Sequence, residues 1–160
     1  MEKVYKITLN NIYKTKYDRL QILEKDREFC NHTMEHFIDV ARIAYIINLE
    51  ENLGIKKQII YAAALLHDIG RADEYDYGIP HHTAGAQIAE EILNSMDIFD
   101  DNEIKDILEA IKEHRSNSSN RTKLGDILYR SDKLSRCCFN CNVNDKCNWS
   151  EDKKNNYLKV

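Results

Sequence analysis

The 160-residue sequence has little proline and glycine, one and five residues, too few for a collagen-like, linker-rich or turn-dense β-protein. It has no apolar run approaching the roughly 20 residues that a membrane-spanning helix needs, and residues 1–10 lack the apolar segment of a signal peptide. Positive charge is not in excess either, because 23 basic residues face 27 acidic ones. These absences predict a cytoplasmic protein and argue against binding to membranes or to extended nucleic acid.

Apolar residues at helical spacing, in contrast, are abundant and predict an all-α, single-domain bundle of about six helices. The run 59–66 is apolar nearly all round, which is typical of a helix at the centre of its domain. The polar stretches 71–80 and 116–120 are expected to be loops. The expected helices span residues 14–28, 33–52, 56–69, 81–95, 100–115 and 122–136. We expect residues 1–136 to form this domain, and residues 137–160 to form a Cys-rich tail that packs on it or is partly flexible.

A His-Asp pair, His67 and Asp68, lies at the end of the most apolar helix. An uncompensated buried carboxylate costs several kcal/mol or more, so Asp68 needs a divalent cation, a buried Arg or a histidine as its partner. Other expected helices also carry such residues, namely His36, His81 or its neighbour His82, His114 and Asp132. Imidazole and carboxylate groups bind transition metals, and helical bundles build metal sites by converging such side chains.

The order His36, His67-Asp68, Asp132 resembles the HD-domain superfamily of metal-dependent phosphohydrolases, α-helical bundles with a lone His, a His-Asp pair and a distant Asp. The segments 65–70 and 131–134 are similar to the central and final motifs of this family, and the resemblance covers about residues 30–136. His81, placed before Gly85, and His114, which ends an Ile-Lys-Glu-His run, resemble the additional histidines of members that hold two metals.

The resemblance implies one or two divalent ions, with Asp68 shared between them in the two-ion case. The implied ligands of the first ion are His36, His67, Asp68 and Asp132, and those added by the second are His81 and His114. The ligand set does not distinguish Fe, Mn, Co, Ni and Zn. If His81 or His114 points elsewhere, the site holds a single ion.

The implied activity is hydrolysis of a phosphomonoester, phosphoanhydride or phosphodiester bond in a small nucleotide-like substrate by metal-activated water. Asp68, Arg71 and Lys133 are the expected catalytic residues, the last two as phosphate-binding groups unless they are merely surface charges. Asp39, one helical turn after His36, is expected to orient that imidazole. For His32, a polar contact at the helix start is favoured over a ligand role.

Two alternatives to the enzyme remain open: a non-catalytic nucleotide- or metal-binding sensor, and a metal site that only stabilises the bundle. The sensor would bind a nucleotide without turnover, and the structural site would have complete coordination with no open position. The sequence leaves the oligomeric state open.

Five cysteines are the remaining feature, and in a chain expected in the cytoplasm they do not indicate a disulfide framework. Cys138, Cys141 and Cys147 form a C-x2-C-x5-C pattern, which indicates a structural zinc or iron–sulfur site. The fourth ligand would be Cys137 or Cys30, and Cys30 would pin the tail against the mouth of the His-Asp site. The alternative is free thiols in a flexible tail.

Overall fold

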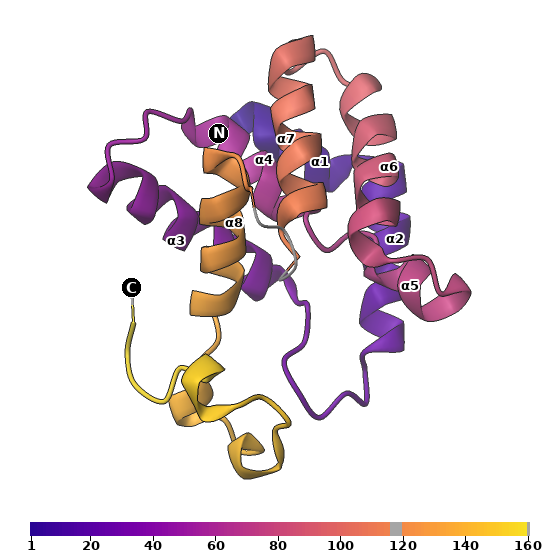
Figure 1. The fold of residues 1–160 in the computed structure, drawn as a ribbon. Coiled ribbons are helices and arrows are strands. Elements are labelled where there is room, and N and C mark those ends of the chain that lie inside the picture. The colour runs from indigo at the N-terminus through magenta and orange to yellow at the C-terminus, as the bar shows by residue number, and fades with distance from the viewer. Residues whose placement is uncertain (116–119, 160) are drawn as a thin grey trace.

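The computed structural model describes residues 1–115 and 120–159, and within these ranges all regular secondary structure is helical, as the sequence predicts (Figure 1). The predicted loop at 116–120 falls mostly outside the described residues. The described α-helices are α1 (Glu2–Leu9), α2 (Asn11–Leu23), α3 (Met34–Glu50), α4 (Lys57–Leu66), α5 (Arg71–Tyr77), α6 (His81–Asn94), α7 (Asp101–Glu113) and α8 (Lys123–Leu134). Among these ranges, no helix is both long and apolar enough to cross a membrane.

Helix α4 forms the centre of the bundle, as its apolar sequence predicts. It contacts α1, α3, α6, α7 and α8, and it buries every residue from Ile59 to Leu66 except the half-buried Tyr61. Full burial of one Ile or Leu side chain stabilises a fold by roughly 1.5–3 kcal/mol. This packing fixes the carboxyl end of α4, where the His-Asp pair follows.

The segment 71–80 corrects the prediction of a loop, because its first seven residues form α5. Its polar sequence lacks a wide apolar face, and its helical state depends on α2, which packs against it. Lys16 Nζ lies 2.6 Å from Asp73 Oδ1, and Arg19 binds both carboxylate oxygens of Asp76 at 2.7 and 2.9 Å. The helix ends at Gly78, whose φ of 70° is accessible to glycine at little cost.

The amino-terminal region also departs from the prediction, since α1 was not expected and α2 lies earlier than residues 14–28. The Asn10 side chain accepts hydrogen bonds from the amides of Ile12 and Tyr13, so it caps α2 at this earlier position. Helix α2 ends at Leu23, and the buried carboxylate of the next residue, Glu24, binds His32.

Two glycines bring the turn after α4 against α6. A Cβ atom added to Gly70 would lie 2.3 Å from both the amide nitrogen of Gly85 and the carbonyl oxygen of His81. Only a residue without a side chain allows this approach of two backbones. The contact places the residues that follow α4 directly beside the first turn of α6.

Candidate metal centre

The His and Asp residues singled out from the sequence sit at or near helix ends that converge on one point. The residue before His67 ends α4, and His81 begins α6. His114 follows the last residue of α7, and Asp132 lies in the final turn of α8. His36 lies in the first turn of α3, which Thr33 caps by accepting a hydrogen bond from the His36 amide.

A first group of possible ligand atoms comes from α3, α8 and the end of α4. It comprises His36, His67, Asp68 and Asp132, and one ligand atom from each lies within 4.8 Å of all the others. His36 Nε2 is 3.6 Å from Asp132 Oδ1, and His67 Nε2 is 3.1 Å from Asp68 Oδ2. These are the four residues of the HD pattern that the sequence predicts to share an ion.

A second group is formed by Asp68, His81 and His114. The Nε2 atoms of both histidines lie 3.6 Å from Asp68 Oδ1, whereas Asp68 Oδ2 faces His67. The two oxygens of one carboxylate therefore belong to two adjacent ligand groups. His82, the alternative to His81, lies outside both groups and contacts Arg115 and Thr83 instead.

Each of the four histidines in these groups has its outer ring nitrogen, Nδ1, engaged. His67 Nδ1 donates to the Ala64 carbonyl at 2.7 Å, and His114 Nδ1 donates to the Ile111 carbonyl at 2.5 Å. Nδ1 of His81 lies 2.9 Å from Glu74 Oε2, and that of His36 lies 3.2 Å from Ser135 Oγ. This arrangement fixes the rings and turns every Nε2 inward, as in metal-binding histidines.

The inner atoms have no hydrogen-bond partner of their own. Nε2 of His36, His67 and His114 and Oδ2 of Asp68 are all buried and lack one. Each such atom costs about 1–3 kcal/mol if it stays unpaired. Divalent cations would satisfy all of them at once, so the donor set fits the metal that the sequence implies.

The protonation states of His36, His81 and Asp68 also suit metal binding. Burial lowers the pKa of His36 and of His81 to about 4, so both rings are neutral near pH 7. Burial by itself would raise the pKa of Asp68, but Arg71, His67, His32 and His114 together outweigh it and hold this pKa well below its ordinary value. A neutral imidazole and an ionised carboxylate are the forms that ligate cations.

Two further residues support the centre, and sequence reasoning missed both. Glu24 binds His32 Nδ1 at 2.6 Å, and the other ring nitrogen of His32 lies 3.4 Å from Asp68 Oδ2. His32 therefore makes the favoured polar contact and also reaches the centre. The second is Ser135, which holds His36 in place of the predicted Asp39. The Asp39 side chain is 50% exposed and faces Arg42.

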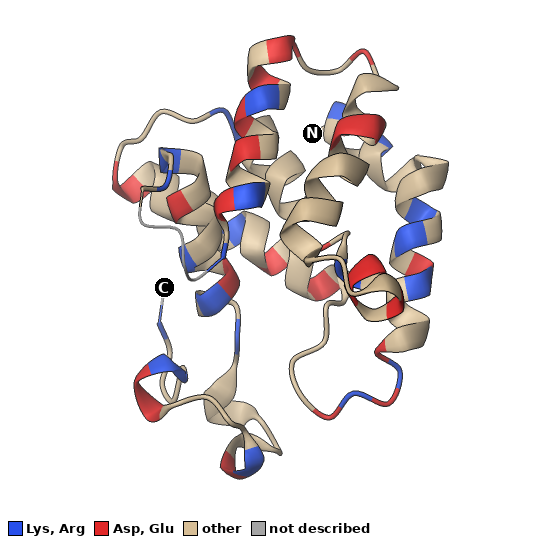
Figure 2. Ribbon diagram, turned by 45° about the vertical axis from the view of Figure 1, so that its right-hand side comes forward, with Lys and Arg blue, Asp and Glu red and all other residues tan. Residues whose placement is uncertain are grey.

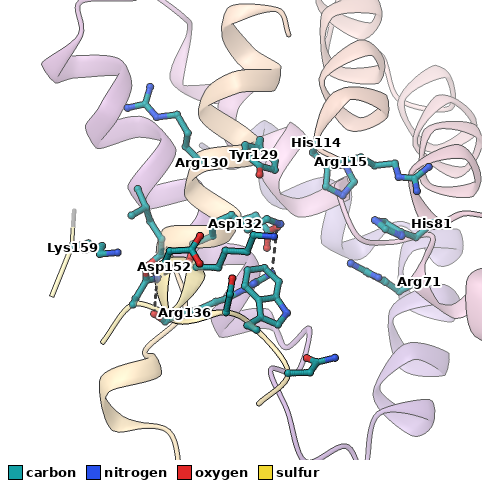
Figure 3. Close-up of a pocket in the computed structure, with 17 residues that line it drawn as sticks. Arg71, His81, His114, Arg115, Tyr129, Arg130, Asp132, Arg136, Asp152 and Lys159 are labelled. Atoms are coloured by element: carbon teal, nitrogen blue, oxygen red, sulfur yellow. Dashed lines mark hydrogen bonds and ion pairs between the residues drawn. The ribbon is translucent and has the colours of Figure 1, made fainter. Parts of the chain in front are cut away.

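A cavity of about 870 Å³ opens beside the second ligand group (Figure 3). Figure 3 shows Arg71 and His81 on one side of it and Asp132 and Arg136 on the other. Although acidic and basic residues are interspersed over the chain (Figure 2), two acidic and seven basic residues line this cavity. The basic residues are Arg71, Arg115, Arg130, Lys133, Arg136, Lys153 and Lys159.

The two residues predicted to bind phosphate both lie where the cavity meets the ligand groups. Arg71 Nε donates to Asp68 Oδ1 at 2.9 Å, and its Nη1 donates to Glu74 at 3.1 Å. Lys133 contacts the carboxylate of Asp132. Both positive groups therefore border the cavity and touch a candidate metal ligand at the same time.

The comparison with protein families matches residues 33–137 to the HD domain. This match covers well over half of the chain, including both ligand groups. The chain therefore belongs to the HD-domain family.

The chain is also similar to known proteins and to a solved structure. An uncharacterized protein of Clostridium beijerinckii is 48% identical over 132 residues, which are 82% of each chain. Ribonuclease Y of Oleidesulfovibrio alaskensis is 31% identical over 107 residues, 67% of this chain but only 18% of that enzyme. The crystal structure of a predicted HD superfamily hydrolase from an uncultured Thermotogales bacterium matches with a TM-score of 0.62 and 28% identity, covering 88% of this chain and 79% of the other.

Proposed function

We propose that this protein is a metal-dependent phosphohydrolase that cleaves a phosphoester or phosphoanhydride bond in a small nucleotide-like substrate. The observation that carries the proposal is that two His/Asp groups sharing Asp68 border a cavity whose charged lining is mainly basic, with seven Lys and Arg residues against two Asp residues. Membership of the HD family and similarity to an HD superfamily hydrolase support hydrolysis in general. The substrate class is inferred from the cavity.

In this proposal His36, His67, Asp68 and Asp132 hold one divalent ion, and Asp68, His81 and His114 hold a second. When bound, such ions make water nucleophilic near neutral pH and neutralise phosphate oxygens. The chain orients the ions through the imidazoles, whose Nδ1 contacts prevent ring rotation. Because Asp68 has one oxygen beside each group, it would hold both ions when they are bound.

The positive residues of the cavity bind and position the phosphate group. Arg71 is held at the rim of the centre by Asp68, and the rest of its guanidinium group can receive a phosphate oxygen. Lys133 provides a second positive charge from the opposite wall. These residues explain how a chain with a net charge of −4 accommodates an anion, because the local field of the cavity differs from the net charge.

Aromatic groups at the cavity support a substrate with a planar base. Trp149 and Tyr129 both line it, and the Arg136 guanidinium lies 3.7 Å from the Trp149 ring centroid. Aromatic and guanidinium faces stack on nucleobases. The volume of the cavity is within the roughly 300–1,000 Å³ of sites for small molecules.

The test is a panel of phosphorylated compounds, incubated with protein reconstituted with each of Mn, Fe, Co, Ni and Zn. The panel contains nucleoside mono- and triphosphates, dinucleoside polyphosphates, cyclic dinucleotides and short oligoribonucleotides. We expect cleavage of at least one nucleotide class, and a loss of about 100-fold or more in Asp68→Asn, which removes the shared ligand.

Asp106→Asn is the matched control, because Asp106 is an exposed carboxylate on α7 that belongs to neither ligand group and does not line the cavity. It should keep full activity. If no metal gives turnover of any compound, or if Asp68→Asn is as active as the control, the proposed function is wrong. Tight nucleotide binding without turnover would favour a sensor instead.

A further inference from the structure

A second, smaller cavity lies away from the His/Asp groups, and its lining is unusually rich in sulfur. Its volume is about 210 Å³. All five cysteines of the chain line it: Cys30, Cys137, Cys138, Cys141 and Cys147. Cys30 belongs to the segment between α2 and α3, and the other four belong to the segment after α8. Regions about a hundred residues apart in sequence therefore bring their thiols together.

Four of these five thiols face one common space and could together bind a metal centre. Cys137 also lines a separate surface pocket together with Arg42, Ile43 and Phe139, so it borders two spaces. Each of the other four cysteines lines the sulfur-rich cavity and no other pocket of the described residues. Cys30, Cys138, Cys141 and Cys147 therefore form the set that faces one common space.

The thiols are spaced more widely than the ligands of a single zinc ion. Four thiolates on one zinc ion, each about 2.3 Å from the metal in a tetrahedron, would lie about 3.8 Å from one another. Among the described residues, no three of these sulfur atoms lie within 4.8 Å of one another. Thiolates that bind different irons of one cluster are spaced more widely, and a cluster needs the room that the cavity provides.

A buried positive charge lies at the same cavity. Lys154 is 7% exposed and lines it. Its ammonium group donates to the Asn144 carbonyl at 3.1 Å and to Glu151 at 2.7 Å. A centre with four thiolate ligands is negatively charged, and a buried cation beside it reduces the cost of that charge.

We infer that Cys30, Cys138, Cys141 and Cys147 hold an iron–sulfur cluster. The cluster ties the segment after α8 to the segment before α3. The segment after α8 also carries Trp149, which lines the larger cavity, so the cluster fixes one wall of the proposed substrate site. The inference concerns a different ligand set from the proposed function, and either can fail without the other.

The experiment measures iron and acid-labile sulfide in protein purified without oxygen, before and after reconstitution with ferrous iron and sulfide. Sulfide is the decisive readout, because iron bound only by His and Asp brings none. We expect iron and sulfide together in the wild-type protein, with the visible absorbance of a cluster. Asp68→Asn should retain the sulfide, because it alters the other centre.

Substitution of single thiols tests the ligand assignment. Cys141→Ser and Cys30→Ser should lose the sulfide, whereas Cys137→Ser should retain it, with circular dichroism used to check that the helices persist. Three results would overturn the inference: no sulfide in reconstituted wild-type protein, zinc without sulfide that is lost in Cys141→Ser, or sulfide retained in Cys30→Ser but lost in Cys137→Ser. The wild-type measurement decides even if a variant does not fold.

Discussion

The His/Asp centre and the cysteine-lined cavity bring ligands together by different means. At the first, helices α3, α4, α6, α7 and α8 pack around an apolar core and deliver side chains whose outer nitrogens are already hydrogen bonded. At the second, Cys138, Cys141 and Cys147 lie on or directly after two short 3-10 turns, Cys138–Asn140 and Asn144–Lys146, that bury no apolar residue. Cys30 comes from the segment between α2 and α3. The packed helices therefore create the first site, whereas the segment that carries most of the second site is held by hydrogen bonds such as those of Asn155 and Lys154 rather than by an apolar core.

The comparison predicts that ligand loss at the His/Asp centre removes metal and activity without unfolding the bundle. His81→Ala should lower the metal content from about two ions per chain to about one and reduce activity by about 100-fold or more. Its neighbour provides the control, because His82 belongs to neither ligand group. Metal analysis and thermal unfolding of both variants check this; equal metal content in the two would contradict the assignment of His81.

A second prediction concerns the backbone contact that supports the His/Asp centre. Gly70→Ala should destabilise the protein by about 1–3 kcal/mol, since a Cβ would press on the backbone of α6 at 2.3 Å. Gly85→Ala is the matched control, because there the nearest atoms lie 3.5 Å from the added Cβ, an ordinary contact. Urea unfolding of both variants measures the difference. Equal stability would show that the centre does not depend on this close approach.

The smallest expected effect is on metal affinity, and it distinguishes Ser135, the observed partner of His36, from Asp39, the predicted one. Ser135→Ala should weaken metal binding by about 10-fold, because it leaves Nδ1 of His36 without its partner. Asp39→Asn should leave the metal affinity unchanged, since its side chain faces Arg42. Titration with a competing chelator measures both affinities. A larger effect from Asp39→Asn would restore the sequence-based prediction.

The sequence alone predicted the helical fold and the residues that the structure brings together as two His/Asp groups. Both depend on strong local signals: the apolar run of α4 and a His-Asp pair placed where burial requires compensation. Helix α5 was missed because its polar sequence becomes helical through ion pairs with α2, residues about 57 positions earlier. The partner of His36 was missed for a related reason. Helical spacing favoured Asp39, but the imidazole nitrogen faces Ser135, which directly follows α8 and lies 99 residues away in sequence.

The side chain of Asn155 connects the order of synthesis to the His/Asp centre. Its amide donates to the carbonyls of Lys133, Leu134 and Arg136, at 2.7, 3.4 and 2.9 Å, and so closes the carboxyl end of α8, the helix that carries Asp132. During translation at roughly 5–20 residues per second, the 22 residues from Lys133 to Asn155 take about 1–4 s. During that interval all six histidines have been synthesised, while the carbonyl groups at the end of α8, beside the ligand Asp132, still lack the Asn155 amide.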